Sequence, residues 1–211
     1  MTPPCLHTYD TLNQRLSNTQ ELLSDHFHKI SAQHVRNGDF VDIHDGIPAD
    51  KEEYDVLIPD MGHEELSRDI SDIFGVLYLS VASGPDLVHA VQRARGLIWG
   101  KNRRCLITLA TRLQGKACQR WVHYLFNTGS PKTYISAQAA SVLGIVNRET
   151  ETLVYIGGHP TTAMVSPEHS HFPELNIIGM DYIDYNRVAV FLDPAKRTFK
   201  FYFGLSGKME A

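Results

Sequence analysis

From Arg104 onward the sequence is a series of short apolar runs separated by turn residues, and this pattern constrains the fold more than any other feature. Runs of this length, rich in β-branched and aromatic residues and bounded by Gly, Pro, Asn or Asp, are typical of β-strands. Tight turns are expected at Gln114–Lys116, at Gly157–Gly158 and around Asp193–Lys196. Pro194 takes the second position of the last turn, which its fixed φ favours. The sequence therefore predicts a mostly β domain in the C-terminal half.

The N-terminal part of the chain has a helical pattern instead. Between Thr11 and His34 an apolar stripe recurs at alternating spacings of four and three residues, which is typical of an amphipathic helix. Thr11 followed by Gln14 fits a capping box at its start. The stripe is compatible with packing on the chain's own domain and with a short coiled-coil seam of roughly three heptads. Both interpretations stay open at this point.

The rest of residues 1–100 is expected to alternate loops and helices. Residues 38–62 are acidic, contain two prolines and lack a sustained period, so a connecting loop is expected there. Helices are predicted over Glu64–Phe74 and Pro85–Trp99, where proline stands in the first turn, with a short buried strand between them. Five basic residues gather in residues 93–104. We interpret them as a solvated hinge rather than a phosphate contact, because the whole chain is acidic.

Composition argues against several classes of protein. The 211 residues have a formal net charge of −4, whereas a general nucleic-acid-binding protein is normally basic. No apolar run approaches the roughly 18 residues of a membrane helix, and the first residues lack a signal-peptide profile. The three cysteines are scattered without a CxxC pair, which argues against a disulfide framework or a zinc site. We expect an intracellular protein, cytoplasmic or nuclear, with no membrane partner, metal or cofactor.

Two motifs in the β-rich half carry the functional argument. The first is YLFNTGS in residues 124–130, where an apolar strand leads directly into four small polar residues. These four residues are Asn127, Thr128, Gly129 and Ser130. The second is LNIIGMDYI in residues 175–183, where two isoleucines precede Gly179 and Asp181. Each motif is weak alone, but their order and the apolar strand before each make the pair specific.

Together the two motifs resemble the retropepsin family, the retroviral and retrotransposon aspartic proteases. In that family an apolar strand enters Asp-Thr/Ser-Gly-Ser/Ala, and an Ile/Leu-Ile/Leu-Gly-x-Asp/Asn segment later opens a short helix. Residues 177–181 fit the second pattern, and residues 126–130 fit the first except that Asn127 stands in place of the aspartate. The resemblance covers about residues 101–204, where it implies a mostly-β retropepsin-like (acid protease) domain, and it says nothing about residues 1–100. With the helical pattern of those residues, the expected fold class is α+β, a helical N-terminal region followed by this domain, and residues 205–211 are expected to form a flexible tail.

The resemblance also implies a homodimer that lacks the family's chemistry. Retropepsins bring one Asp-Thr-Gly loop from each of two chains together, and the two close carboxylates share a proton and activate a water molecule. Asparagine is nearly isosteric with aspartate and can still form hydrogen bonds, but it cannot take a proton from water. A homodimer would bring Asn127 against Asn127 of the second copy. Hydrolysis by the family mechanism is therefore expected to be absent.

The other motif residues have supporting roles in the resemblance. Thr128 would brace the two loops of the dimer, and Gly129 would allow the tight turn. Ser130 and Gly179 would support the loop. Asp181, the remaining motif carboxylate, would be structural rather than catalytic.

Retropepsins further carry a glycine-rich hairpin flap that closes over the substrate. Residues 153–165 align better with the strand pair after the flap, which leaves residues 146–152 for the flap itself and predicts a short connection. In an alternative alignment Gly157 and Gly158 form the flap tip. Without a lid, the exclusion of water and the positioning of a substrate would both be weaker.

Two explanations of Asn127 remain open. In the first, the substitution is natural and the domain is a pseudoprotease, reused as a homodimerisation scaffold or to bind a peptide or protein ligand. In the second, an active dimeric aspartic endopeptidase was silenced by replacing its catalytic aspartate. The short predicted flap favours the first explanation.

Overall fold

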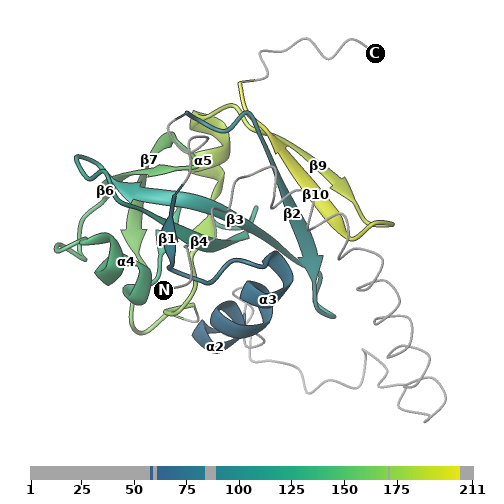
Figure 1. Cartoon of the computed structure of the whole chain (residues 1–211), viewed down its shortest axis with the longest axis horizontal. Helices are drawn as coiled ribbons and strands as arrows, with labels where there is room; N and C mark the ends of the chain where they lie inside the picture. The colour runs from purple at the N-terminus through teal and green to yellow at the C-terminus, as the bar shows by residue number, and fades with distance from the viewer. Residues whose placement is uncertain (1–57, 59–60, 84–88, 171, 205–211) are drawn as a thin grey trace, which may run out of the picture.

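The structure is a computed structural model that describes residue 58 and residues 61–83, 89–170 and 172–204 (Figure 1). Most of the regular structure in these residues is β. The strands are β1 (Val81–Ala82), β2 (Arg93–Trp99), β3 (Arg104–Leu113), β4 (Gln119–Phe126), β5 (Tyr134–Ile135), β6 (Thr152–Ile156), β7 (His159–Val165), β8 (Ile177–Ile178), β9 (Ala189–Asp193) and β10 (Thr198–Tyr202). Two short helices lie between strands, α4 (Ala137–Leu143) and α5 (Met180–Tyr185).

The strands form one sheet that partly closes on itself. Its order is β1-β4-β8-β5-β7-β6-β3-β2-β10-β9, and an additional pairing of β3 with β4 closes six of the strands into a barrel. The pairs β4–β8 and β5–β7 are parallel, and the other pairs are antiparallel. The predicted mostly β C-terminal half is therefore confirmed, including the turns after β3, after β6 and after β9.

The long hairpin of β3 and β4 forms the centre of the barrel. Ile107 lies opposite Tyr124 and Leu109 lies opposite Val122, and all four side chains are fully buried. Because successive side chains of a strand point to opposite faces, the next pair, Thr108 and His123, faces away from this set. That second face is covered by a helical segment from the N-terminal part of the chain.

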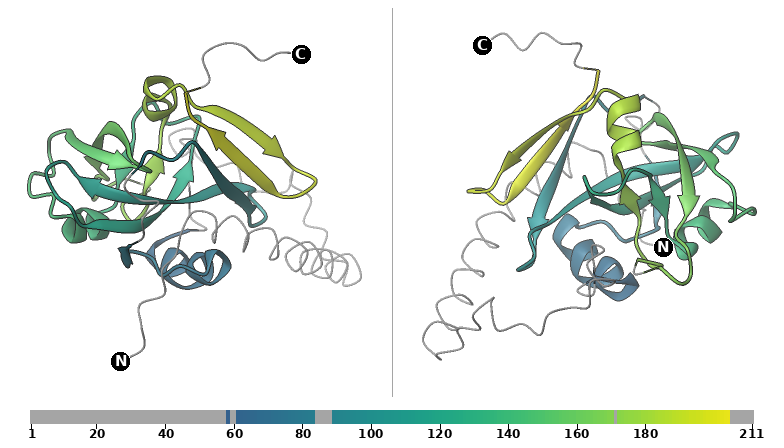
Figure 2. Two further views of the ribbon diagram at one scale, coloured as in Figure 1. Left: turned by 45° about the horizontal axis from the view of Figure 1, so that its top comes forward. Right: turned by 180° about the vertical axis from the view of Figure 1, so that it is seen from behind.

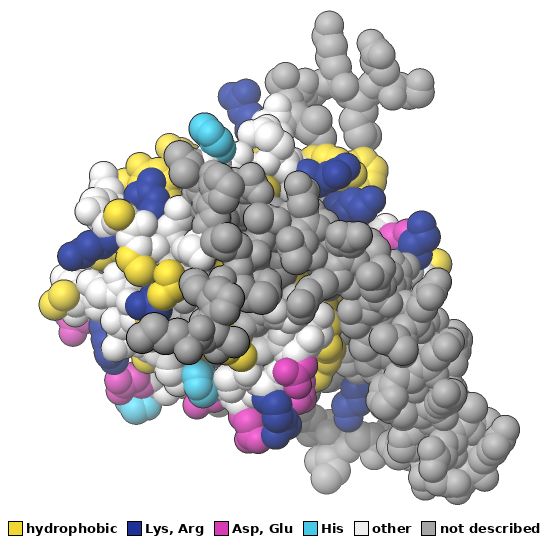
Figure 3. All heavy atoms as spheres, in the orientation of Figure 1, with side chains coloured by type: hydrophobic (Ala, Val, Ile, Leu, Met, Phe, Trp, Pro, Cys, Tyr) yellow, Lys and Arg dark blue, Asp and Glu magenta, His cyan; other side chains and the backbone are white. Residues whose placement is uncertain are grey.

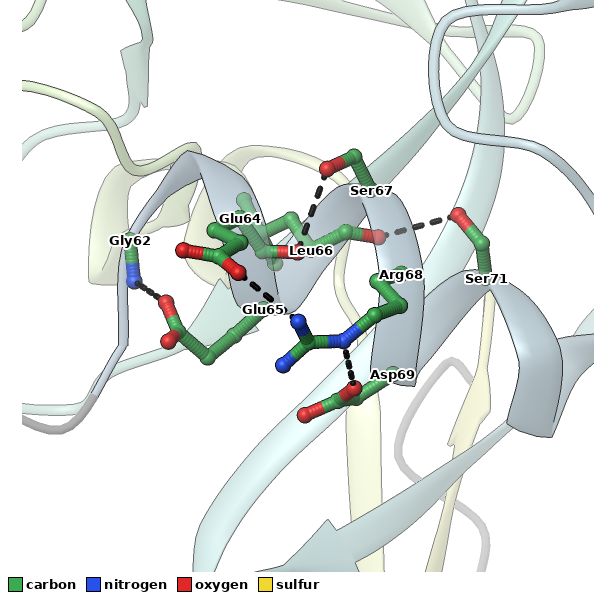
Figure 4. A network of polar contacts seen from close by, with 8 residues as sticks. All are labelled: Gly62, Glu64, Glu65, Leu66, Ser67, Arg68, Asp69 and Ser71. Carbon is green, nitrogen blue, oxygen red and sulfur yellow. Dashed lines mark hydrogen bonds and ion pairs between the residues drawn. The ribbon is translucent and has the colours of Figure 1, made fainter.

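The helical segment is continuous over His63–Phe74 and consists of α2 (His63–Glu65), the π-helical turn η3 (Leu66–Ile70) and α3 (Ser71–Phe74). At its start Oε2 of Glu65 accepts a hydrogen bond of 2.8 Å from the backbone N–H of Gly62 (Figure 4). It ends at Gly75, whose φ of 64° is left-handed and therefore suits glycine. The predicted helix over Glu64–Phe74 is confirmed.

His123 joins this helical segment to the barrel. Its Nε2 lies 3.2 Å from Oγ of Ser71 and its Nδ1 lies 2.8 Å from Oγ1 of Thr108. The ring of Phe74 stacks on the imidazole with centroids 5.6 Å apart. Complete burial lowers the pKa of His123 to about 3, so the imidazole is neutral near neutral pH. The segment and the barrel thus share one core.

Beyond the barrel, β2, β10 and β9 continue the sheet as a three-stranded extension. Figure 2 shows from two further sides that the β9–β10 hairpin extends away from the barrel. The rings of Phe199 and Phe201 reach Phe126 at the end of β4, with centroids 6.1 and 5.2 Å away. One face of the extension is therefore packed on the end of the barrel.

The helix predicted over Pro85–Trp99 is wrong in its described part, because β2 occupies Arg93–Trp99. The alternation of exposed Arg93 with buried Ala94 has the period of a strand rather than of a helix. A Cβ at Gly96 would lie 2.3 Å from the ring of Phe199, so this glycine permits the close approach of β10. Residues 93–99, which the sequence pattern predicts as helical, thus belong to the sheet.

The buried strand predicted between the two helices is also largely wrong. Only Val81–Ala82 pair as a strand, with β4, and turns precede them. Leu79 has a φ of 61°, which a regular strand does not contain. The predictions for residues 11–34, for most of residues 38–62 and for residues 205–211 lie outside the described residues. Within the described part of the chain, no helix is long and apolar enough to span a membrane.

Candidate functional site

The two sequence motifs lie side by side in the fold. The parallel pairing of β4 with β8 sets Leu125 beside Ile177 and Phe126 beside Ile178. Beyond the last pair, the backbone N–H of Asn127 donates a hydrogen bond of 3.1 Å to the carbonyl of Ile178. The strands β4 and β8 therefore end side by side, and the loop of each motif begins at the same edge.

Asn127 opens a tight loop that points outward. Its Oδ1 accepts a hydrogen bond of 2.9 Å from the N–H of Gly129, and its carbonyl accepts one of 3.1 Å from the N–H of Ser130. Asn127 itself is half-buried, whereas Thr128 and Gly129 are exposed. The loop thus presents an amide and a hydroxyl at the surface of the chain, both of which can form hydrogen bonds.

The loop rests on the second motif. The carbonyl of Ser130 accepts a hydrogen bond of 2.9 Å from the N–H of Met180, and Oγ of Ser130 donates one of 2.7 Å to the carbonyl of Lys132. A Cβ at Gly179 would lie 2.2 Å from that same carbonyl oxygen of Lys132. Glycine is therefore needed at position 179 because the backbone of the first motif lies directly against it.

Asp181 is engaged by donors from inside the protein. Its Oδ2 accepts a hydrogen bond of 2.9 Å from the N–H of Thr133. Its Oδ1 accepts one of 2.6 Å from the Thr133 hydroxyl and one of 2.7 Å from the N–H of Tyr182. Oγ1 of Thr133 in turn accepts a hydrogen bond of 3.2 Å from the N–H of Gly179. This carboxylate holds the two motifs together and does not face the outward loop.

Thr133 has a role that sequence reasoning did not assign. It lies shortly after the first motif, in a string of small and polar residues with no feature that distinguishes one threonine from another. Its position opposite Asp181 comes from the placement of β5 beside β8. The one signal for Thr133 in the sequence is indirect: an inward-facing carboxylate at Asp181 needs hydrogen-bond donors, and a threonine near the first motif can supply them.

Asn176 is the second residue that the sequence did not reveal. Its Nδ2 donates hydrogen bonds to the hydroxyl of Tyr78, at 2.6 Å, and to the carbonyl of His123, at 3.1 Å. Its Oδ1 accepts one of 2.9 Å from the N–H of Ser136, the residue that caps α4. Asn176 is fully buried, so these contacts fix the start of β8 against the helical segment and against α4.

The Gly157–Gly158 turn lies at the far end of β3 from the Asn127 loop. Along β3, Cys105 pairs with Phe126 beside the loop, whereas Thr111 pairs with Ile156 beside the turn.

The turn is also held on both sides. Its first residue, Gly157, donates a hydrogen bond of 2.8 Å to the carbonyl of Ala110 and accepts one of 2.9 Å from the N–H of Val91. A Cβ at Gly158 would lie 2.6 Å from Cα of Ala90. In this structure the turn is therefore a strand connection that is held by contacts with β3 and with residues 90–91.

The segment next to the loop is the connection between α4 and β6. In this segment Oε1 of Glu151 lies 2.7 Å from Nζ of Lys132, which follows the first motif. The hydrogen bond between the two groups raises the pKa of Lys132 and lowers the pKa of Glu151. Both side chains are substantially exposed, so the ion pair positions the segment without adding much stability.

The site contains no arrangement for metal chemistry in its described part. Over residues 61–83, 89–170 and 172–204, no three His, Cys, Asp or Glu side chains are placed to hold a metal ion. The groups that the loop offers are the amide of Asn127, the hydroxyl of Thr128 and backbone N–H groups. They can orient and bind a polar ligand, but they include no base.

Comparison with known proteins gave remote structural similarities. No family model and no curated protein matches the sequence. The structure is similar to a retropepsin-like aspartic protease from Rickettsia conorii, with a TM-score of 0.37, 10% identity, and 53% of this chain and 92% of that chain covered. It is also similar to the retroviral protease-like domain of Ddi1 from Leishmania major, with a TM-score of 0.31, 15% identity, and 44% and 89% covered.

Proposed function

We propose that this chain contains a retropepsin-like domain that lacks the catalytic carboxylate, forms a homodimer through its Asn127 loop, and binds a peptide or protein without cleaving it. The observation that carries the proposal is the packing of the two motifs. Asn127 opens the loop at the end of β4, and Gly179 and Asp181 brace that loop from β8 and α5. The supporting geometry is complete, and the residue that would perform the chemistry is an amide.

The proposed loss of catalysis follows from the ability of the groups at the site to accept or donate a proton. A retropepsin-type reaction needs one carboxylate to accept a proton from water while a second, protonated one polarises the scissile carbonyl. The amide of Asn127 can donate to a carbonyl, but it accepts no proton near neutral pH. Asp181 cannot replace it, because both of its oxygens already accept hydrogen bonds from Thr133 and Tyr182.

The exposure of the loop tip supports the dimer. Thr128 and Gly129 are exposed in the single chain, and Met180, which follows the glycine beneath the loop, is 39% exposed although it is apolar. A two-fold axis through this region would place the same patch of both copies in contact, as an isologous interface requires. Such an interface stabilises the pair whether or not the centre is catalytic.

The short connection beside the loop determines how a ligand would be held. Residues 146–151 are all exposed, and the ion pair of Glu151 with Lys132 fastens their end next to the first motif. A connection of this size cannot cover an extended peptide as a long hairpin lid does. We therefore expect a bound peptide to exchange with solvent freely, which suits a binding scaffold better than an enzyme.

The test is a comparison of the wild-type chain with Asn127→Asp on a mixed peptide library between about pH 4 and 7, where a carboxylate dyad can share a proton. Asn147→Asp is the matched control, because it makes the same chemical change in an exposed loop. Cleavage is followed by mass spectrometry with and without a statine-type inhibitor, and peptide retention is measured by equilibrium dialysis.

The expected result is that the wild-type chain and Asn147→Asp retain peptides and cleave none. Inhibitor-sensitive cleavage by Asn127→Asp would show that a single amide separates this chain from a protease. If that variant does not cleave peptides either, the short connection over residues 146–151 also contributes to the loss of activity. Inhibitor-sensitive cleavage by the wild-type chain, or a failure of all three proteins to retain any peptide, would overturn the proposal.

A further inference from the structure

The charge of the chain is unevenly distributed, and the three-stranded extension is its basic part. Residues 93–104 and 189–204 together carry eight of the 20 basic residues of the chain but only one of its 24 acidic residues. The acidic total therefore conceals a strongly positive local surface. The fold brings the two stretches together, because all of β10 pairs with residues 93–97 of β2.

The strand register sorts these residues onto one face. Arg93 lies opposite Tyr202, and Arg95 lies opposite Lys200, which in turn lies opposite Phe191. Cross-strand partners share a face of the sheet. The face that carries these five residues is called the basic–aromatic face here. It combines cationic side chains and aromatic rings from three strands, and its one acidic residue is Asp193, opposite Thr198.

The opposite face of the same strands is the one that packs on the barrel. There Ala94 lies opposite Phe201, and both are buried. On the basic–aromatic face, by contrast, Arg93 and Lys200 are exposed and Phe191 is 49% exposed. Figure 3 shows Lys and Arg side chains next to hydrophobic ones over the β9–β10 hairpin. The end of the face that carries Arg93, Lys200 and Phe191 is therefore accessible to a ligand, whereas Leu97 and Thr198 at its other end are buried.

Two turns extend the positive surface at one end of the sheet. The guanidinium of Arg197 donates hydrogen bonds to the carbonyl of Gly100, at 2.8 Å, and to that of Ile98, at 3.2 Å, which holds the β9–β10 turn against the β2–β3 turn. Burial, together with the nearby charge of Arg103, lowers the pKa of Arg197. Like charges are thus held close together, and an anion would relieve their repulsion.

The aromatic rings on this face are placed for stacking. Phe191 and Tyr202 meet edge to face, with centroids 5.5 Å apart and an interplanar angle of 78°. Because Phe191 is half exposed and Tyr202 is partly exposed, parts of both rings are open to solvent. A cationic sheet surface with exposed aromatic rings offers both of the contacts that single-stranded nucleic acids use, phosphate pairing and base stacking.

We infer that the basic–aromatic face binds single-stranded nucleic acid, with Arg93 and Lys200 on phosphates and with Phe191 and Tyr202 against bases. This activity is separate from the peptide binding proposed for the Asn127 loop. Arginine suits the phosphate contacts because its planar fork matches two phosphate oxygens. An anionic membrane is the less fitting partner, since it requires a wider apolar surface that can enter the lipid.

The test measures binding of the full-length chain to fluorescein-labelled oligouridylate of 20 nucleotides by fluorescence anisotropy, over a series of salt concentrations. The variants are the double substitution Arg93→Gln with Lys200→Gln and the single substitution Phe191→Ala. Lys116→Gln with Arg148→Gln is the matched control, because both residues are exposed and lie outside the extension. Thermal melting checks that all variants fold as the wild-type chain does.

The wild-type chain is expected to bind with an affinity that falls as salt rises. The double variant should lower the affinity at least about tenfold and reduce the slope of log K against log salt by about 1.4, since each phosphate contact on a single strand contributes about 0.7. Phe191→Ala should weaken binding by about tenfold through lost stacking, with the slope unchanged. The control should behave as the wild-type chain.

Three results would overturn the inference. The first is no measurable binding at low salt. The second is an equal loss in the control and in the double variant, because the binding would then depend on overall charge. The third is binding to phosphatidylserine vesicles that exceeds binding to the oligonucleotide and is lost in the double variant, because the face would then be a membrane surface.

Discussion

The hydroxyl of Thr133 donates a hydrogen bond of 2.6 Å to Oδ1 of Asp181, which links the segment between the first motif and β5 to the helix that begins in the second motif. The backbone N–H of Thr133 donates to the other oxygen of the same carboxylate. A single acidic side chain therefore fixes the relative position of the two segments that build the candidate site. It does so from beneath the loop and leaves the loop tip open.

Asp181→Asn is expected to destabilise the protein by about 2–3 kcal/mol. The side-chain NH₂ group of asparagine would face a donor of Thr133, which now donates a hydrogen bond to a carboxylate oxygen. Urea unfolding measures the change. Asp184→Asn on the same helix is the control, since Asp184 is exposed, and its effect should stay within about 0.5 kcal/mol. Equal effects of the two substitutions would show that Asp181 does not hold the motifs together.

Gly179→Ala is expected to destabilise the protein by about 3 kcal/mol or more, since the new Cβ would overlap the carbonyl oxygen of Lys132 and would also lie 2.9 Å from that of Ser130. The yield of soluble protein and the thermal midpoint report the effect. Met180→Ala at the neighbouring, partly exposed position serves for comparison. An alanine at position 179 that leaves the midpoint unchanged would contradict the close packing of the two motifs.

Tyr78→Phe tests whether the helical N-terminal segment and the barrel form one unit. The hydroxyl of Tyr78 lies 3.1 Å from Oγ of Ser136 and accepts a hydrogen bond from Asn176, so its removal leaves a buried amide donor short of a partner. We expect a loss of about 1–2 kcal/mol in a single unfolding transition. Tyr185→Phe, at a residue that is 71% exposed, should have almost no effect. Two separate transitions would show that the parts unfold independently.

His123 gives the folded protein a specific dependence on pH. Its pKa is about 3 in the fold, against 6.5 for an ordinary histidine, so between these values the unfolded chain binds a proton that the folded chain does not. Stability should therefore fall as pH drops below about 6.5, by up to about 1.4 kcal/mol per pH unit from this group. The effect is absent above that range.

The measurement compares the free energy of unfolding of the wild-type chain with that of His123→Gln from pH 7 to pH 5. His123→Gln is less stable at pH 7, and its deficit should shrink as the pH falls, because only the wild-type chain loses the histidine contribution. His169→Gln, at an exposed position, should follow the wild-type curve. A deficit of His123→Gln that stays constant with pH would contradict the neutral, buried imidazole.

The strands of the C-terminal half could be predicted because their signals are local. Alternating or apolar runs end at residues with a definite turn preference, such as Pro194 and Gly115, and the hairpins form where those residues stand. The β2 strand could not be predicted in the same way. Its neighbouring residues Leu97 and Ile98 are both buried, and its partner β10 lies far away in the sequence, so this apolar run shows no alternation that would identify a strand.

Only the residues of the candidate site that belong to the two sequence motifs could be predicted with their roles. The sequence identified Asn127, Gly179 and Asp181 because their order carries a pattern. It could not identify Thr133 or Asn176, whose roles depend on which strand lies next to β8 and on a hydroxyl from the N-terminal segment. Contacts of this kind are properties of the assembled core rather than of any local stretch.

The most direct test of the central claim asks whether two Asn127 loops meet across a two-fold axis. The experiment places a single cysteine at Thr128→Cys, at the exposed loop tip, in a background whose three native cysteines are replaced by serine. Thr162→Cys, at an exposed position of β7, is the matched control. Because a disulfide requires the two Cβ atoms to lie about 4 Å apart, it reports contact at that position alone.

Mild oxidation at low micromolar protein should convert Thr128→Cys to a covalent dimer on a non-reducing gel, while Thr162→Cys stays monomeric. Sedimentation velocity of the reduced proteins should show the same dimer for both. A Thr128→Cys protein that remains uncrosslinked, or a reduced chain that sediments as a monomer at this concentration, would contradict the pairing of the two loops.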